Sequence, residues 1–178
     1  EIRADAVCLQ ETKMQPDQLT LELEGYRNRL ENMVEEQAEI ITSRTRQIEE
    51  IQEAVIVGMA NLIESRDGTT GEHVKRSATY VDYLVDRMVE KGIYVDKLND
   101  TFIYYVKKSA PLHDLGKIAV DDRILRKPGK FTPEEFEEMK KHAEKGADIV
   151  GQILDGVEDE EFVRIAKNVA HYHHERWD

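Results

Sequence analysis

The segment from Arg27 to Leu62 contains almost no residue that would break a helix. Within it, one set of positions alternates in steps of four and three: Leu30, Val34, Gln37, Ile41, Arg44, Ile48, Ile51, Val55, Gly58 and Leu62. This heptad spacing predicts a long helix that pairs with a second copy as a parallel coiled coil. The two polar members of the stripe would weaken the pairing, but they could set or shift its register. The alternative is a single amphipathic helix packed on its own domain.

The rest of the sequence toward the C-terminus predicts helices and turns alone, so the expected fold class is all-α. Thr69 and Glu72 have the spacing of a capping box, which would start a helix near residue 70, and Gly92 would end it. Three further helices are expected, over residues 100–115, 132–154 and 159–173.

The first 26 residues differ from the rest of the chain. Ala4–Leu9 is a short apolar run that resembles a strand, and Pro16 and Gly25 punctuate the residues after it. We therefore divide the chain into an N-terminal segment of unclear origin over residues 1–26, a signalling helix over 27–57 and a helical domain over 58–178.

Charge and composition exclude several classes of protein. The net charge is −12, with 37 acidic against 25 basic residues, so the overall field does not attract nucleic acid. No run approaches the about 20 apolar residues that span a bilayer, and no secretory signal opens the chain. The single cysteine, Cys8, excludes an internal disulfide framework. We expect a protein of the cytoplasm that has no membrane segment.

All six histidines lie after residue 72, and the residues near them in the sequence indicate a metal site. His113 is followed by Asp114, a pair in which the imidazole can bind one ion while the carboxylate bridges two. Lys117 lies one helical turn after His113 and could contact a phosphate oxygen. The chain ends with three histidines in four positions, His171, His173 and His174.

Three motifs in order carry a resemblance to a known family. They are RDGTTGEHVKR around His73, PLHDLGKIAVDDRILRKPGKFTPEEFEEMKKH from Pro111 to His142, and HYHHERWD at the end. Together they resemble the HD-GYP family of bacterial phosphodiesterases, over about residues 54 to 178. The resemblance implies an HD-type helical bundle that hydrolyses cyclic di-GMP to the linear dinucleotide and GMP.

The resemblance also implies a site. Its metal ligands would be His73, His113, Asp114, His142, His173 and His174. Asp114 would bridge two divalent ions, with iron or manganese preferred and nickel, zinc or magnesium as alternatives. Lys117 would bind the substrate phosphate with Arg76 near it, and His113, Asp114 and Lys117 would form the catalytic group. His171 matches no ligand of the family.

Two departures from the family pattern bear on this site. The position four before His73 is often a glutamate that helps to hold a third metal, but here it is Thr69, so two ions are expected. The family's glycine-tyrosine-proline segment and a further aspartate ligand would come after Asp178. We therefore expect a chain cut before its last ligand, which would fold poorly, bind metal weakly and turn over little or no substrate.

Two further resemblances concern the N-terminal part. LELEGYRNRLENMVEEQ resembles the connector between a receiver domain and an HD-GYP domain, which implies an upstream receiver or sensor in a two-component signalling protein. ADAVCLQETKMQPDQLTLELEGY resembles a short fragment of the exonuclease III family, but one motif without the rest of that fold makes no nuclease site.

Three other interpretations stay open beside the cyclic di-GMP phosphodiesterase. The first is an HD phosphohydrolase for another nucleotide, and the second is a catalytically impaired helical dimer that senses nucleotide or metal. The third is a helical scaffold without a bound metal.

Overall fold

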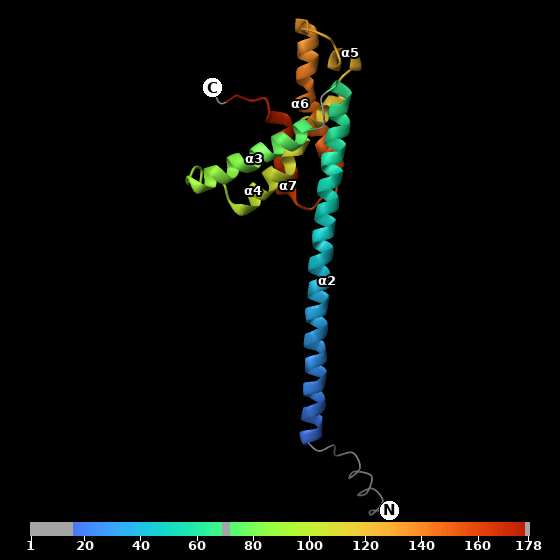
Figure 1. Cartoon of the computed structure of the whole chain (residues 1–178), viewed down its shortest axis with the longest axis vertical. Coiled ribbons are helices and arrows are strands. Elements are labelled where there is room, and N and C mark those ends of the chain that lie inside the picture. Colours follow the sequence, from blue (N-terminus) through green and yellow to red (C-terminus); the bar gives the residue numbers. More distant parts are fainter. Residues whose placement is uncertain (1–15, 69–71, 177–178) are drawn as a thin grey trace, which may run out of the picture. The chain divides into compact units, whose positions relative to one another are not determined.

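The computed structural model describes residues 16–68 and 72–176, and within this part every regular element is a helix. The predicted all-α class is therefore confirmed (Figure 1). The α-helices are α2 (Pro16–Glu64), α3 (Glu72–Glu90), α4 (Asp100–Ser109), α5 (Asp122–Leu125), α6 (Pro133–Ile153) and α7 (Glu160–Tyr172). Short 3₁₀ helices are η1 (Ser65–Asp67), η2 (Ala110–Leu112) and η3 (Leu115–Ala119). The strand expected at Ala4–Leu9 and the cap expected at Thr69 lie outside the described residues.

The chain divides into two compact units, residues 1–50 and 51–178. In the first unit the described part is helical from Pro16, so the long helix begins well before the expected Arg27. Pro16 and Gly25 do not interrupt it, because proline is tolerated in the first turn of a helix and one interior glycine costs only about 1 kcal/mol.

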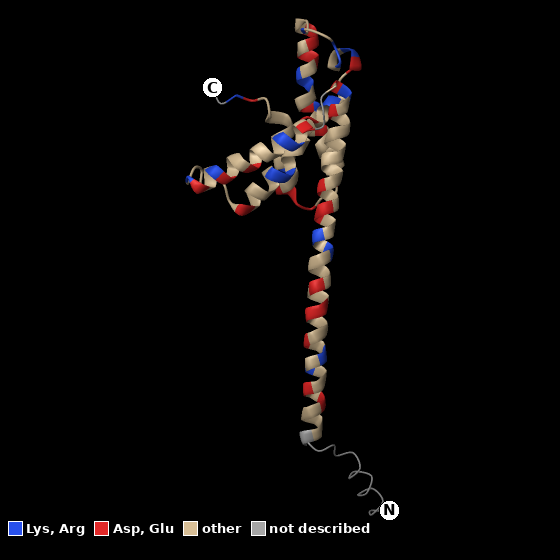
Figure 2. Cartoon of the chain, in the orientation of Figure 1, with Lys and Arg blue, Asp and Glu red and all other residues tan. Residues whose placement is uncertain are grey.

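The predicted heptad stripe is exposed along this first unit. Leu30, Val34, Ile41 and Ile48 are each more than half exposed. Acidic and basic residues are mixed along α2 and α6, without a long tract of one sign (Figure 2). No helix in the described part of the chain is both long and apolar enough to cross a membrane.

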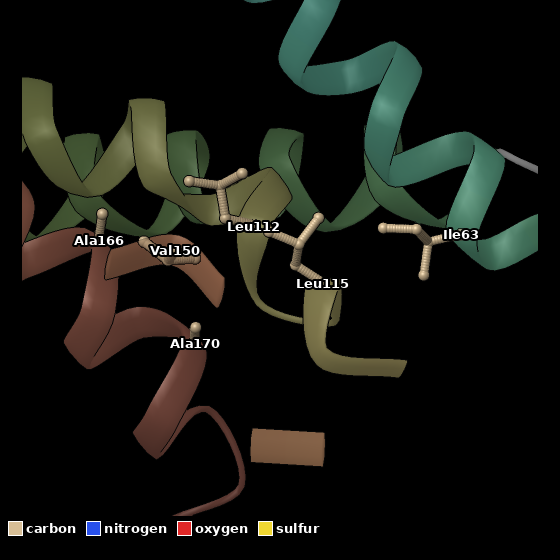
Figure 3. Packing of buried hydrophobic residues seen from close by; sticks show 6 residues of the cluster. All are labelled: Ile63, Leu112, Leu115, Val150, Ala166 and Ala170. Atoms are coloured by element: carbon tan, nitrogen blue, oxygen red, sulfur yellow. The ribbon is translucent and has the colours of Figure 1, made fainter. Parts of the chain in front are cut away.

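The second unit has a small apolar core whose members lie far apart in the sequence. Figure 3 shows its members, Ile63 from the end of α2, Leu112 and Leu115 from η2 and η3, Val150 from α6, and Ala166 and Ala170 from α7. Val150, Ala166 and Ala170 are fully buried, and the two alanines let α7 pack closely on α6. This core joins η2, η3, α6 and α7, and all the histidines except His73 lie in or directly beside these elements.

The helix expected over residues 100–115 is shorter than predicted, because α4 ends at Ser109 and two 3₁₀ turns come after it. Pro111 explains the change: it has no amide hydrogen to continue the helical bonding, and its ring crowds the preceding turn. Asp114 has left the helical region, with φ −97° and ψ 11°. Neighbouring residues of a regular helix diverge, but this irregular turn lets His113 and Asp114 face one site.

Helix α6 follows the predicted capping box closely. The Thr132 hydroxyl accepts a hydrogen bond from the Glu135 amide, and the Glu135 carboxylate accepts one from the Thr132 amide. Pro133 occupies the first turn, and the helix ends at Ile153, close to the predicted end. Helix α7 is capped by Asp159, whose carboxylate accepts a hydrogen bond from the Phe162 amide.

Segment η3 crosses α6 at two glycines, Gly116 and Gly146. A Cβ atom on Gly116 would lie 1.8 Å from the carbonyl oxygen of His142 and 2.5 Å from the amide nitrogen of Gly146. Only glycine allows this close approach of two backbones. The crossing therefore holds Leu115 and Lys117, the neighbours of Gly116 on η3, beside the part of α6 where His142 lies.

Candidate metal centre

Three histidines are held in the same way by their own backbone. The Nδ1 atoms of His113, His142 and His173 lie 3.0, 2.6 and 2.9 Å from the carbonyl oxygens three residues before them, those of Ala110, Met139 and Ala170. A carbonyl oxygen only accepts, so each Nδ1 carries the hydrogen and donates it. In the neutral imidazole each Nε2 is thereby left as the lone-pair nitrogen, which is the state that binds a metal ion.

All three Nε2 atoms face the carboxylate of Asp114. Those of His142 and His173 lie 3.3 and 3.4 Å from its Oδ1, and that of His113 lies 3.3 Å from its Oδ2. The Asp114 carboxylate is nearly buried, with 12% of the side chain exposed. A buried anion surrounded by imidazoles is the environment that a divalent cation requires.

The ligand atoms form two groups that share one residue. Asp114, His142, His173 and His174 offer ligand atoms within 4.8 Å of one another, and so do His73, His113 and Asp114. A carboxylate common to two such groups can bridge two ions, and mixed imidazole and carboxylate donors suit transition metals. The donor set therefore fits a pair of divalent metals.

The pKa values of the site reflect this crowding. Burial alone would raise the pKa of Asp114, but His113, His142 and His173, whose Nε2 atoms donate hydrogen bonds to its carboxylate when the rings are protonated, hold it far below its usual range. Burial opposes the charged form of His113, yet the Asp114 carboxylate outweighs it and raises the pKa of His113. Burial, assisted by His173, lowers the pKa of His174. The lowered pKa of Asp114 favours its charged form even without an added cation.

Lys117 forms a sheltered ion pair at the edge of this group. Its Nζ lies 2.9 Å from Asp114 Oδ2 and 3.0 Å from Asp67 Oδ2, with only 19% of the lysine side chain exposed. Burial alone would lower the pKa of Lys117, but the two carboxylates more than compensate and raise it. The structure therefore presents a fully charged ammonium beside the candidate metal ligands.

The structure brings together all the predicted metal ligands, together with Lys117. Arg76 differs, because it pairs with Glu72 on the exposed side of α3, at 3.1 Å. Its role in substrate binding stays a prediction. His171 belongs to neither ligand group and packs on Tyr172, as expected for a residue that matches no ligand. The expected number of two ions also stays a prediction.

Sequence reasoning missed two acidic residues near the end of α2. Glu64 is almost fully buried, and its Oε1 lies 3.7 Å from His73 Nε2. Asp67 pairs with Lys117 from the adjoining turn η1. Asp67 lies within the motif around His73, but a carboxylate in a polar turn looks like a solvated residue until the fold places it against a buried lysine.

The packed helices and the ligands that share Asp114 define a helical domain with the donor set of a two-metal centre. Residues 70–178 match the model of the family described as HD domain, and this chain belongs to that family.

Similar proteins match about three quarters of the chain. A probable cyclic di-GMP phosphodiesterase of Vibrio cholerae is 38% identical over 145 residues, which cover 78% of this chain and 32% of that protein. A cyclic di-GMP phosphodiesterase of the same organism is 39% identical over 132 residues, covering 74% and 27%. A third, 3'3'-cGAMP-specific phosphodiesterase 2, is 34% identical over 131 residues, covering 74% and 23%. The chain thus spans about a third or less of the length of these relatives.

Proposed function

We propose that this chain is part of a metal-dependent phosphodiesterase of the HD-GYP type, which hydrolyses cyclic di-GMP. The observation that carries the proposal is the common anchoring of His113, His142 and His173, whose Nε2 atoms converge on Asp114. The choice of cyclic di-GMP as the substrate follows from the relatives that are named cyclic di-GMP phosphodiesterase.

In this proposal the imidazole and carboxylate side chains hold the metal ions, and the cationic side chains bind the substrate. The two ligand groups would hold two divalent ions, iron or manganese first, with His73 and His174 completing the sets. Bound ions of this kind act as Lewis acids and lower the pKa of water toward neutrality. Lys117 keeps its positive charge beside them and would bind a non-bridging oxygen of the substrate phosphate. Arg76 would contact the substrate further out.

Metal content tests the centre directly. In protein purified without chelator, mass spectrometry should find about two equivalents of metal, as the two ligand groups require. Asp114→Ala removes the shared carboxylate and should lose most of both equivalents. His171→Ala is the matched control and should keep them, because His171 lies in neither group. Wild-type protein without metal would contradict the proposal.

Substrate choice is tested separately on the metal-loaded protein. We expect hydrolysis of cyclic di-GMP in the wild type and in His171→Ala, and a loss of at least about a hundredfold in Asp114→Ala. The relative that is specific for 3'3'-cGAMP favours a second candidate substrate. A panel with both cyclic dinucleotides decides between them, and preference for the mixed one would replace the first choice.

The exposed heptad stripe of α2 supports a homodimer as the working form. Apolar side chains such as Leu30, Val34 and Ile41 are exposed in the described part of the first unit, and a partner helix would bury them. We propose that this coiled coil carries the state of an upstream receiver or sensor domain to the phosphodiesterase, in the cytoplasm.

A further inference from the structure

Lys117 has two carboxylate partners, Asp114 and Asp67, which differ in their other contacts. Asp114 also faces three imidazoles and belongs to both candidate ligand groups. Asp67 belongs to neither group in the part of the chain that the structure describes, and it forms an ion pair with Lys117. When Asp114 is engaged with metal ions, the attraction between it and Lys117 is weakened by their positive charge.

Asp67 itself is held firmly against the segment that carries Lys117. It ends the turn η1, and the next residue, Gly68, has the left-handed φ of 79°. The neighbouring Arg66 donates hydrogen bonds from Nη1 to the backbone oxygen of Ile118, at 2.9 Å, and from Nη2 to Asp122 Oδ1, at 2.7 Å. Arg66 therefore binds the backbone of η3, while Asp67 binds the ammonium that η3 carries.

A fixed position of the Lys117 ammonium would favour contact with a substrate phosphate. A lysine has a flexible four-carbon stem, so an ammonium without a fixed partner samples many positions. The Asp67 side chain is only 10% exposed, which shields its charge from water and makes this pair stronger than a surface pair. Asp67 would thus hold the Lys117 ammonium in place where a substrate phosphate arrives.

We propose that Asp67 is the positioning residue for Lys117, the contact that fixes the phosphate-binding ammonium once the metal ions occupy Asp114. This inference rests on the proposed function for the role of Lys117. The contact itself can be tested without a substrate.

The test observes the ammonium of Lys117 in protein loaded with zinc, which is diamagnetic, after ¹⁵N labelling of lysine. Ion pairing slows hydrogen exchange, so the wild type should show a Lys117 Nζ signal, assigned by its loss in Lys117→Arg. Asp67→Asn keeps the side-chain shape and should remove the signal, while the zinc content stays at the wild-type level. A signal that persists in zinc-loaded Asp67→Asn would overturn the proposal, as would a loss of zinc, which would make Asp67 a ligand.

Asp82→Asn is the matched control. Lys107 also contacts two carboxylates, with Nζ 3.8 Å from Asp82 and 2.8 Å from Asp86, on the surface between α3 and α4. The same substitution there should leave the signal of Lys117 unchanged. Thermal unfolding of both variants shows whether they are folded, and loss of the Lys117 signal in a folded Asp67→Asn is the expected result.

A second measurement connects the contact to the phosphate. Titration of the zinc-loaded proteins with cyclic di-GMP should show binding that is roughly tenfold weaker in Asp67→Asn than in the wild type or Asp82→Asn. Equal affinity in all three would overturn the positioning role. If the wild type itself does not bind cyclic di-GMP but Lys117 is still held through Asp67, the proposed function fails, whereas the contact stands.

Discussion

Among the described glycines, Gly116 leaves the least room for a Cβ atom, so Gly116→Ala is the perturbation that tests the crossing of η3 and α6. The new Cβ would lie 1.8 Å from the carbonyl oxygen of His142 and 2.8 Å from the Cα of Gly146. An ordinary contact needs on the order of 3.4 Å, so the two segments must separate by on the order of 1.5 Å. Both obstacles are backbone atoms, so no side chain can rotate to make room.

The separation has an energetic and a functional consequence. Overpacking a core costs about 1–3 kcal/mol and occasionally more, and a clash of backbone with backbone belongs at the upper end. For a chain of this length, about 3 kcal/mol corresponds to a fall in Tm of roughly 6–12 °C. Asp114 Oδ1 and His142 Nε2 lie 3.3 Å apart on the two sides of the crossing. A shift of this size would exceed the about 0.5 Å that a preorganised site tolerates, so metal content should fall as well.

The assay is thermal unfolding followed by near-ultraviolet circular dichroism of tyrosine, together with a measurement of metal content. Six of the seven tyrosines lie after residue 50, so the signal reports mainly on the second unit. Gly58→Ala is the control, because a Cβ there meets nothing within 4 Å and alanine favours a helix by about 0.5–1 kcal/mol. Gly146→Ala should fall between the two, since its closest contacts are 3.2 and 3.4 Å. A Gly116→Ala variant as stable and as metal-rich as Gly58→Ala would refute this reasoning.

Three further predictions concern protons and assembly. Metal affinity, measured by chelator competition, should fall as the pH falls, because the raised pKa of His113 favours its proton over a metal; a flat profile would exclude His113 as a ligand. The hydrogen bond to Asp159 raises the pKa of Tyr105 to about 12, so its contribution to stability is complete below about pH 10 and is lost as the pH rises toward 12. In an NMR titration of the tyrosines, Asp159→Asn should return this midpoint toward about 10, and an unchanged midpoint would contradict the assignment. Ile41→Asp places a charge in the exposed stripe and should shift sedimentation equilibrium from dimer to monomer, whereas a wild type that sediments as a monomer would refute the coiled coil.

Much of the local structure was predictable from the sequence, because its signals act between residues a few positions apart. The Thr132 capping box, the stop at Gly92 and the helix that Asp159 caps all lie where local hydrogen bonding places them. The candidate metal ligands were also predicted, but only through the order of three motifs: His142 on its own is a histidine in a lysine-rich helix. The predicted end of α4 was wrong, because Pro111 disrupts the turn before it.

The chemistry of the candidate site, by contrast, depends on which side chains come into contact. Only the tertiary structure determines those contacts. The sequence by itself determined an all-helical chain rich in metal-binding side chains, since amphipathic spacing and residue type are local properties. Packing decided that η3 touches α6 through two glycines, that Asp114 faces three anchored imidazoles, and that Asp67 meets Lys117. Asp67 and Lys117 are 50 residues apart in the chain. Contacts between residues so far apart in the sequence depend on the burial of apolar faces around Val150 and Ala166. The residue pattern of a single helix does not predict which other helix will bury its apolar face.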